Sequence, residues 1–109
     1  MKDDKIYLLH IRDAIHRIIE YTREGSSTFV KDTKTQDAVL RQLEIIGEAT
    51  KNISPALREK NPAIPWKKIA GLRDKVIHEY FGVNIELVWN VVENQIPTLE
   101  KNISKLLAE

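Results

Sequence analysis

The stretch KTQDAVLRQLEIIGEATKNI, residues 34–53, decides the fold. Its apolar side chains recur every three or four residues, the spacing that gathers them along one face of an α-helix. The main stripe consists of Val39, Leu43, Ile46, Thr50 and Ile53, and it is widened by Ala38, Ile45 and Ala49. Just before it, Thr33 and Gln36 fit a capping box, with Asp37 in the first turn. The stretch therefore predicts an amphipathic helix.

The same helical period is found upstream of this stretch. A helix over about residues 3–23 is predicted by the stripe of Leu8, Ile11, Ile15 and Ile18. The glycine and two serines at residues 25–27 end it, and residues 25–34 read as a polar loop with Phe29 and Val30 as candidate apolar anchors. After residue 53, Ser54-Pro55 indicates an N-cap followed by proline at the first position of a short helix.

Two further helices follow. Pro65 can open the segment WKKIAGLRDKVIHEY, residues 66–80, which we predict to be one helix ending near Gly82. Asn84 is the candidate N-cap of the last helix. The apolar stripe of that helix is Val88, Val92, Ile96, Leu99, Ile103 and Leu106. Pro97 lies inside this pattern, and because proline lacks an amide donor we expect a kink or a restart there.

Alternation with a period of two, which would indicate strands, is not convincing in any segment. Several amphipathic helices with short connections predict an all-α fold, an antiparallel helical bundle of four to five helices. Residues 1–109 fit a single domain by length. Because the bundle is small and its apolar stripes are wide, we also expect a homodimer in which each chain buries a face against the other.

The composition excludes several classes of protein. The chain has no cysteine, so a disulfide framework, a thiolate nucleophile and a zinc–cysteine site are excluded. The segment MKDDKIYLLHIRD lacks the long apolar core of a signal peptide, and no apolar run approaches the length needed to span a bilayer. We expect a soluble cytoplasmic protein that does not bind membranes.

The charge is unevenly distributed although the net charge is only +1. Residues 51–78 carry seven Lys or Arg against two Asp or Glu, whereas the segments on either side are net acidic. A local positive field of this kind can attract phosphate groups even on a near-neutral protein. An ordinary solvated charged surface explains the same pattern, so charge alone does not decide between them.

The basic segment ends in RDKVIHEYFG, residues 73–82, which carries the candidate chemistry. His78 can transfer protons near neutral pH, and the guanidinium of Arg73 can hold a phosphate through a fork of donors. On an ideal helix Arg73 and His78 would lie about 140° apart, whereas Arg73 and Tyr80 would be nearly in line. A two-fold axis near this helix would let each chain complete the site of the other. The alternative is a surface arginine, a histidine near a helix end and a core tyrosine.

Nearby side chains can assist such a site. Asp74 can accept a hydrogen bond from His78 and fix its tautomer, and an ordinary exposed pair is an equally open interpretation. Lys67, Lys68 and Lys75 can hold flanking phosphates of RNA without reading sequence, or they can form a solvated helix face.

Other groups are weaker candidates. His16 and Glu20 are spaced to share a metal ion, but two ligands without a third make a weak site. Glu44 and Glu48 can do acid–base chemistry or bind Mg²⁺, and we prefer them as interhelical partners of arginine, with Arg41 one turn away. The two tryptophans, Trp66 and Trp89, fit core or dimer-interface anchors better than base-stacking platforms.

Four stretches of the chain resemble HepT-type members of the HEPN superfamily, small all-helical proteins encoded beside minimal nucleotidyltransferases in prokaryotes. They are DKIYLLHIRDAIHRI (4–18), RQLEIIGEATKNIS (41–54), NPAIPWKKIAGLRDKVIHEYFGVN (61–84) and VWNVVENQIPTLEKNI (88–103). The short motif R-x4-H-x-Y is weak alone, but here it is embedded in LEIIGEA, IPW and GLRD at the spacing of the family.

The resemblance implies a ribonuclease toxin of a type VII-like toxin–antitoxin pair. Arg73 and His78 match the catalytic pair of HEPN ribonucleases, which need no metal or other cofactor, and Asp74 fills the polar position after the arginine. Tyr80 matches the tyrosine that the partner nucleotidyltransferase adenylylates to silence the toxin. The substrate would be RNA, with tRNA and mRNA both open. Two alternatives stay open: a non-catalytic subunit that binds nucleotide or substrate for the nucleotidyltransferase, and a structural helical adaptor.

Overall fold

The computed structural model describes residues 2–78 and 82–109, with the backbone alone described at Lys2 and His78. This part of the chain is all-α apart from one short antiparallel hairpin, which confirms the predicted fold class. The elements in chain order are α1 (Lys2–Tyr21), α2 (Ser26–Phe29), α3 (Thr33–Lys51), α4 (Pro55–Lys60), α5 (Trp66–Ala70), α6 (Leu72–Val76), β1 (Ile77–His78), β2 (Gly82–Val83), α7 (Ile85–Asn90), the π-helix η1 (Val91–Gln95) and α8 (Ile96–Ala108).

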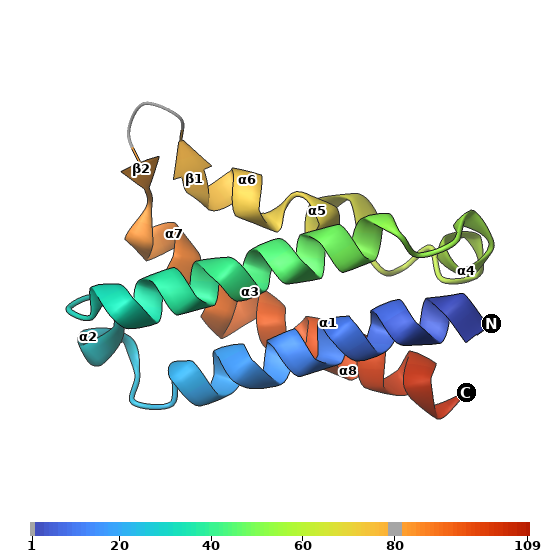
Figure 1. Cartoon of the computed structure of the whole chain (residues 1–109), viewed down its shortest axis with the longest axis horizontal. Helices are drawn as coiled ribbons and strands as arrows, with labels where there is room; N and C mark the ends of the chain where they lie inside the picture. The colour runs from blue at the N-terminus through green and yellow to red at the C-terminus, as the bar shows by residue number, and fades with distance from the viewer. Residues whose placement is uncertain (1, 79–81) are drawn as a thin grey trace.

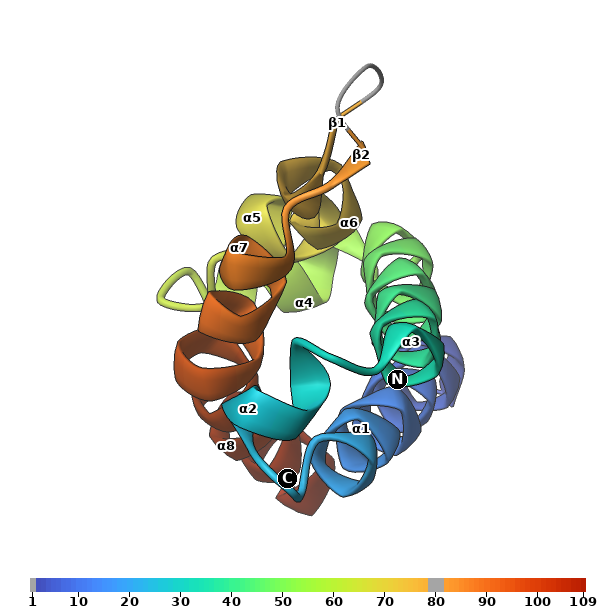
Figure 2. The same ribbon diagram turned by 90° about the vertical axis from the view of Figure 1, so that its left-hand side faces the viewer.

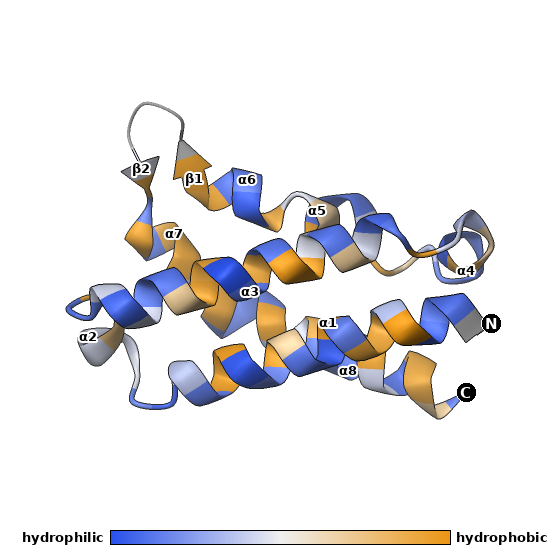
Figure 3. Cartoon of the chain, in the orientation of Figure 1, coloured by the Kyte–Doolittle hydropathy of each residue, from blue (hydrophilic) through white to orange (hydrophobic). Residues whose placement is uncertain are grey.

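The helices enclose one apolar core. The long helices α1 and α3 run antiparallel and side by side, with α8 along α1 and α5 along α3 (Figure 1). Viewed from the end, α1, α3, α5–α6 and α7–α8 surround a common centre (Figure 2). The predicted stripes supply the buried residues Ile11, Ile15, Ile18, Val39, Leu43, Ile46, Ile53, Val88, Ile96, Leu99, Ile103 and Leu106. On the outer faces of α1 and α3, hydrophilic residues alternate with the edges of these stripes (Figure 3).

Side-chain caps define two of the helix starts, as predicted. Ser54 precedes α4, and its Oγ accepts a hydrogen bond from the Leu57 amide at 3.1 Å. Asn84 precedes α7, and its side chain accepts one from the Leu87 amide at 3.0 Å. Each cap satisfies an amide that has no partner within its own helix.

The predicted start of α3 is wrong by one residue. Asp32, rather than Thr33, is the N-cap, and its carboxylate accepts hydrogen bonds from the amides of Lys34 at 3.1 Å and Thr35 at 3.4 Å. Gln36 does not complete a capping box, because its Nε2 donates to the carbonyl of Phe29 at 2.9 Å. That bond fastens α3 to the short helix α2, which occupies part of the region predicted to be a loop.

Of the two apolar anchors predicted for residues 25–34, one is confirmed and the other is wrong. Phe29 is buried and lies with its ring centroid 5.4 Å from that of Trp89 on α7. Val30 was also a candidate anchor, but half of its surface is exposed. Of the two candidate anchors, Phe29 is therefore the one that packs in the core.

The last helix changes its winding before Pro97, as predicted. Residues Val91–Gln95 form a π-helix, and α8 restarts at Ile96 with proline in its first turn. Proline cannot donate to the carbonyl of Glu93, and the wider π turn accommodates the missing bond. The change of winding keeps Val91, Val92 and Ile96 all buried.

The prediction of one helix over residues 66–80 is wrong. Helix α5 ends at Ala70, with Gly71 as its C-cap. Helix α6 ends at Val76, after which Ile77 adopts an extended conformation with φ −112° and ψ 125°. Strands β1 and β2 pair Ile77 with Val83 and His78 with Gly82. Gly82 has φ 74°, a left-handed conformation that favours glycine. The Asn84 amide closes the hairpin by donating to the Val76 carbonyl at 2.8 Å.

The hairpin places Ile77 and Val83 partly buried against the core, which offsets the loss of helical hydrogen bonds. Tyr80 lies outside the described residues. Over residues 2–78 and 82–109, the helices are each too short or too polar to cross a membrane.

Candidate active site

Arg73 lies on α6 and faces helix α3. Its Nε is 3.2 Å from Oε2 of Glu44, and one terminal nitrogen is 3.8 Å from Oδ1 of Asp74. The other carboxylate oxygen of Glu44 receives a hydrogen bond of 2.7 Å from Arg41, one turn earlier on α3. Glu44 therefore joins two guanidinium groups that come from two different helices.

These residues line a hollow of about 270 Å³ where α3 meets α6 and the start of β1. Arg41, Glu44 and Arg73 form one side of it together with Asp37, and Leu40 and Ile77 complete the lining. Two arginines and two carboxylates thus share a small, open space. Such a space can bind the phosphate of a ligand through the guanidinium donors that the carboxylates leave free, because a guanidinium binds carboxylate and phosphate through the same geometry.

His78 follows Ile77 directly, so its backbone leaves from the edge of this hollow. The structure describes the strand backbone of His78 and not its side chain, and it leaves out Tyr80. The helical angles expected between Arg73, His78 and Tyr80 do not apply, because the α-helix ends at Val76. For the same reason Asp74 and His78 are not stacked one helical turn apart.

The three candidate RNA-binding lysines are exposed on α5 and α6. Lys68 and Lys75 line a second hollow, of about 500 Å³, with Gly71 and Gln95. Arg73 is not part of its lining. The structure therefore brings Lys68 and Lys75 together, whereas Lys67 is part of the lining of neither this hollow nor that of Arg73.

The weaker candidates have structural roles. Glu44 pairs with Arg73 on α6 at 3.2 Å, which confirms the interpretation of this carboxylate as an interhelical partner of arginine. The same interpretation of Glu48 is wrong, because Glu48 pairs with Lys51 of its own helix at 3.2 Å. His16 lies 3.3 Å from Glu100 on α8 rather than beside Glu20. Among residues 2–78 and 82–109, no three His, Asp or Glu side chains are grouped as metal ligands.

The tryptophans are anchors, as predicted. Trp66 is buried, and its indole nitrogen donates to the Asn61 carbonyl at 3.0 Å. Trp89 is partly buried against Phe29. Both rings therefore pack in the core or against it.

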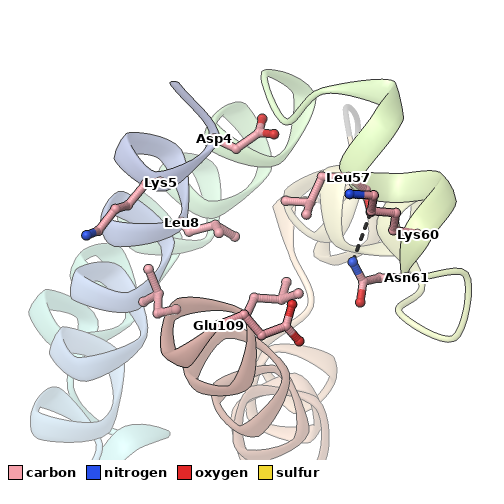
Figure 4. A pocket seen from close by; sticks show the side chains of 9 residues that line it. Asp4, Lys5, Leu8, Leu57, Lys60, Asn61 and Glu109 are labelled. Carbon is pink, nitrogen blue, oxygen red and sulfur yellow. Dashed lines mark hydrogen bonds between the residues drawn. The ribbon is translucent and has the colours of Figure 1, made fainter. Parts of the chain in front are cut away.

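A larger hollow, of about 630 Å³, lies at the opposite end of the bundle from the hairpin, between α1, α4 and the end of α8 (Figures 1 and 4). Asp4 is its buried acid, and the carboxylate accepts hydrogen bonds from the amide and hydroxyl of Ser54 at 2.8 and 2.7 Å. These bonds fasten the start of α4 to α1. The carboxylate of Asp4 therefore has a structural role.

Sequence reasoning missed the contact that brings α3 into the site. Arg41 and Glu44 were recognised as neighbours, but nothing in the spacing connects Glu44 with Arg73. An exposed glutamate tends to pair with an arginine on an adjacent helix, but this tendency does not identify which arginine it meets.

The family model described as "Ribonuclease HepT-like" matches residues 11–106, which include α3, α6 and the hairpin. The chain belongs to the HepT-like ribonuclease family. A HepT-like relative from Thermococcus cleftensis, named "Probable ribonuclease HepT", is 47% identical over 96% of this chain and 96% of its own length.

Other members of the HepT-like family extend the comparison. A relative from Caldanaerobacter subterraneus, whose name contains the word RNase, is 47% identical over 98% of this chain and 96% of its own length. The "mRNA nuclease HepT" of Shewanella oneidensis is 27% identical over 91% of this chain and 92% of its own length. No solved structure matches the chain.

Proposed function

We propose that this protein is a metal-independent endoribonuclease, the toxin of a toxin–antitoxin pair. The observation that carries the proposal is the hollow in which Arg73 lies, because the strand with His78 starts at its edge. Membership of the HepT-like ribonuclease family and the nuclease names of the relatives support the same activity. Lys67, Lys68 and Lys75 are proposed to hold flanking phosphates of the RNA.

The proposed reaction uses the 2′-hydroxyl of RNA as the nucleophile. Its oxygen bonds to the adjacent phosphorus and loses a proton, while the bond to the 5′-oxygen breaks and that oxygen gains a proton. His78 carries out one of these proton transfers. Arg73 stabilises the negative charge that gathers on the phosphoryl oxygens in the transition state. The products are a 2′,3′-cyclic phosphate and a 5′-hydroxyl.

The proposed active form is a homodimer, with the sites at a cleft between the two chains. The Arg73 side chain contacts Glu44 on α3 of the same chain, whereas His78 lies on β1, which follows the end of α6. A second chain facing this region would bring another arginine and histidine to the same cleft.

The proposed silencing step is adenylylation of Tyr80 by a partner nucleotidyltransferase. The tyrosine oxygen would attack the α-phosphorus of ATP, and pyrophosphate would leave. The attached AMP adds bulk and negative charge two residues from His78. It would repel the substrate phosphate and could occupy Arg73.

The test is cleavage of tRNA and mRNA in EDTA by the purified chain without its partner. We expect the parent to cut RNA, and Arg73→Ala and His78→Ala to lower the rate by about a hundredfold or more. Arg12→Ala and His16→Ala are matched controls, because these exposed side chains pair with Asp13 and Glu100 away from the hollow.

Two results would count against the proposal. If folded, unmodified parent leaves both RNAs intact, the enzyme assignment fails for these substrates, and a non-catalytic subunit of the nucleotidyltransferase becomes the leading interpretation. If cutting continues undiminished in both site variants, the activity does not reside at Arg73 and His78.

A further inference from the structure

Glu44 holds two guanidinium groups at once. Its Oε1 pairs with Arg41 at 2.7 Å and its Oε2 pairs with Arg73 at 3.2 Å. Arg41 is anchored on the long helix α3, whereas Arg73 lies on the short helix α6. The carboxylate therefore fixes the distance between two cations that the chain itself separates by many residues.

The two ion pairs of Glu44 contribute little to the stability of the fold. The side chains of Arg41, Arg73 and Glu44 are 67%, 46% and 38% exposed, and exposed ion pairs contribute little to folding because water and salt screen them. They are better suited to orienting the side chains of Arg41 and Arg73. Arg73 contacts Glu44 through Nε, and one of its terminal nitrogens is 3.8 Å from Asp74, which leaves the other terminal nitrogen for a further acceptor. Arg41 contacts Glu44 through one terminal nitrogen and keeps its other donors.

We propose that Arg41 is a second phosphate-binding residue of the RNA site, and that Glu44 positions both arginines. Arg41 contacts a phosphate next to the one that Arg73 holds. The carboxylate between them anchors both guanidinium groups and offsets part of their positive charge, so that a phosphate binds reversibly. This inference rests on the proposed function and adds a substrate contact on α3.

The surface beyond Arg41 has room for the RNA chain. A further hollow, of about 410 Å³, lies between α1 and α3 and shares Arg41 and Glu44 with the hollow of Arg73. Tyr7 and His10 line its far side. A strand that passes Arg73 can therefore continue over α3 past Arg41, and the guanidinium would meet its backbone there.

The binding test uses a fluorescent single-stranded RNA and variants made in the inactive His78→Ala protein. Arg41→Ala is expected to raise Kd about tenfold and to lower the slope of log Kd against log salt by about 0.7, the loss of one phosphate contact. Arg41→Lys keeps the charge and should restore the salt slope but only part of the affinity. Arg12→Ala is the matched control and should leave both quantities unchanged.

The catalytic test separates positioning from charge. Glu44→Gln is made in the active protein, with Glu20→Gln as the control, since Glu20 is exposed on α1 and is not part of the lining of either hollow. We expect Glu44→Gln to lower kcat, because Arg73 loses its orientation, and not to raise KM, because a negative charge has been removed. Melting temperatures of all variants are measured alongside.

The outcomes are distinguishable. If Arg73→Ala weakens RNA binding and cleavage while Arg41→Ala leaves Kd and the salt slope unchanged, the inference about Arg41 is overturned and the proposed function stands. If Glu44→Gln leaves kcat unchanged or raises it, the positioning role is overturned. If the parent does not cleave RNA, or cleaves it without need of Arg73, the proposed function itself fails.

Discussion

At the scale of single residues, Asp32 shows how a local hydrogen bond sets a helix boundary. The Thr35 hydroxyl donates to its carboxylate at 2.7 Å, and this bond, followed by those from the Thr35 and Lys34 amides, holds the pKa of Asp32 below its usual value. Because the folded-state pKa is lowered, the cap stabilises the fold above the unfolded-state pKa. Its contribution is lost as the pH falls through the folded-state value.

The variant Asp32→Ala tests this boundary. We expect a lower melting temperature than that of the parent at neutral pH, and a difference that shrinks as the medium becomes acidic enough to protonate Asp32. Asp37→Ala is the control, because Asp37 is exposed and caps no helix. A difference in melting temperature that stays constant down to strongly acidic pH would show that the charge of Asp32 is not what stabilises α3.

At the scale of elements, the site depends on how closely α3 approaches α5. Gly47 makes this possible, since a Cβ atom there would lie 2.9 Å from the Ala70 carbonyl oxygen. The contact lies one helical turn from Glu44 and on the chain just before α6, so it sets the separation between Glu44 and Arg73. Backbone atoms of two packed helices cannot move apart without disturbing their shared core.

Gly47→Ala is therefore expected to destabilise the protein. Overpacking costs about 1–3 kcal/mol, and the better helix propensity of alanine returns up to about 1 kcal/mol. Urea unfolding should give a lower free energy of unfolding for Gly47→Ala. The control is Gly71→Ala, where the new Cβ would be 3.6 Å from its nearest neighbour. Equal or greater stability of Gly47→Ala would mean that α3 and α5 are not in tight contact.

At the scale of the whole molecule, the proposed dimer can be tested by asking whether the Arg73 and the His78 of one site come from the same chain. Arg73→Ala and His78→Ala are each expected to be inactive, and mixing them tests whether sites are shared between subunits. If a site takes its arginine from one chain and its histidine from the other, each mixed dimer contains one intact site. Random exchange then restores about a quarter of the parent activity.

The matched control is each variant subjected alone to the same mixing procedure. Mass spectrometry of the intact complexes should show mixed dimers in the sample that regains activity. Mixed dimers without any cleavage would mean that Arg73 and His78 of the same chain form the site. A mixture that stays monomeric would contradict the proposed dimer.

The sequence by itself determined the long helices α1 and α3, the last helical segment with its change of winding before Pro97, and the starts of α4 and α7. The stripes over α1, α3 and α8 depend on neighbours three and four residues apart, and the caps at Ser54 and Asn84 depend on the next turn, so the information is local. The residue types of the site, Arg73 and His78, could also be selected from the sequence. Where they lie relative to each other could not, because that depended on an assumed continuous helix.

Only the tertiary structure decided that α6 ends at Val76 and that Glu44 meets Arg73. Ile77 and Val83 leave helical geometry because the pair packs on a core built by other segments, and Glu44 reaches Arg73 because Gly47 lets two helices approach. Both outcomes are set by contacts between residues far apart in the chain. The energy of such contacts depends on packing in space, which the spacing of residues along a sequence does not record.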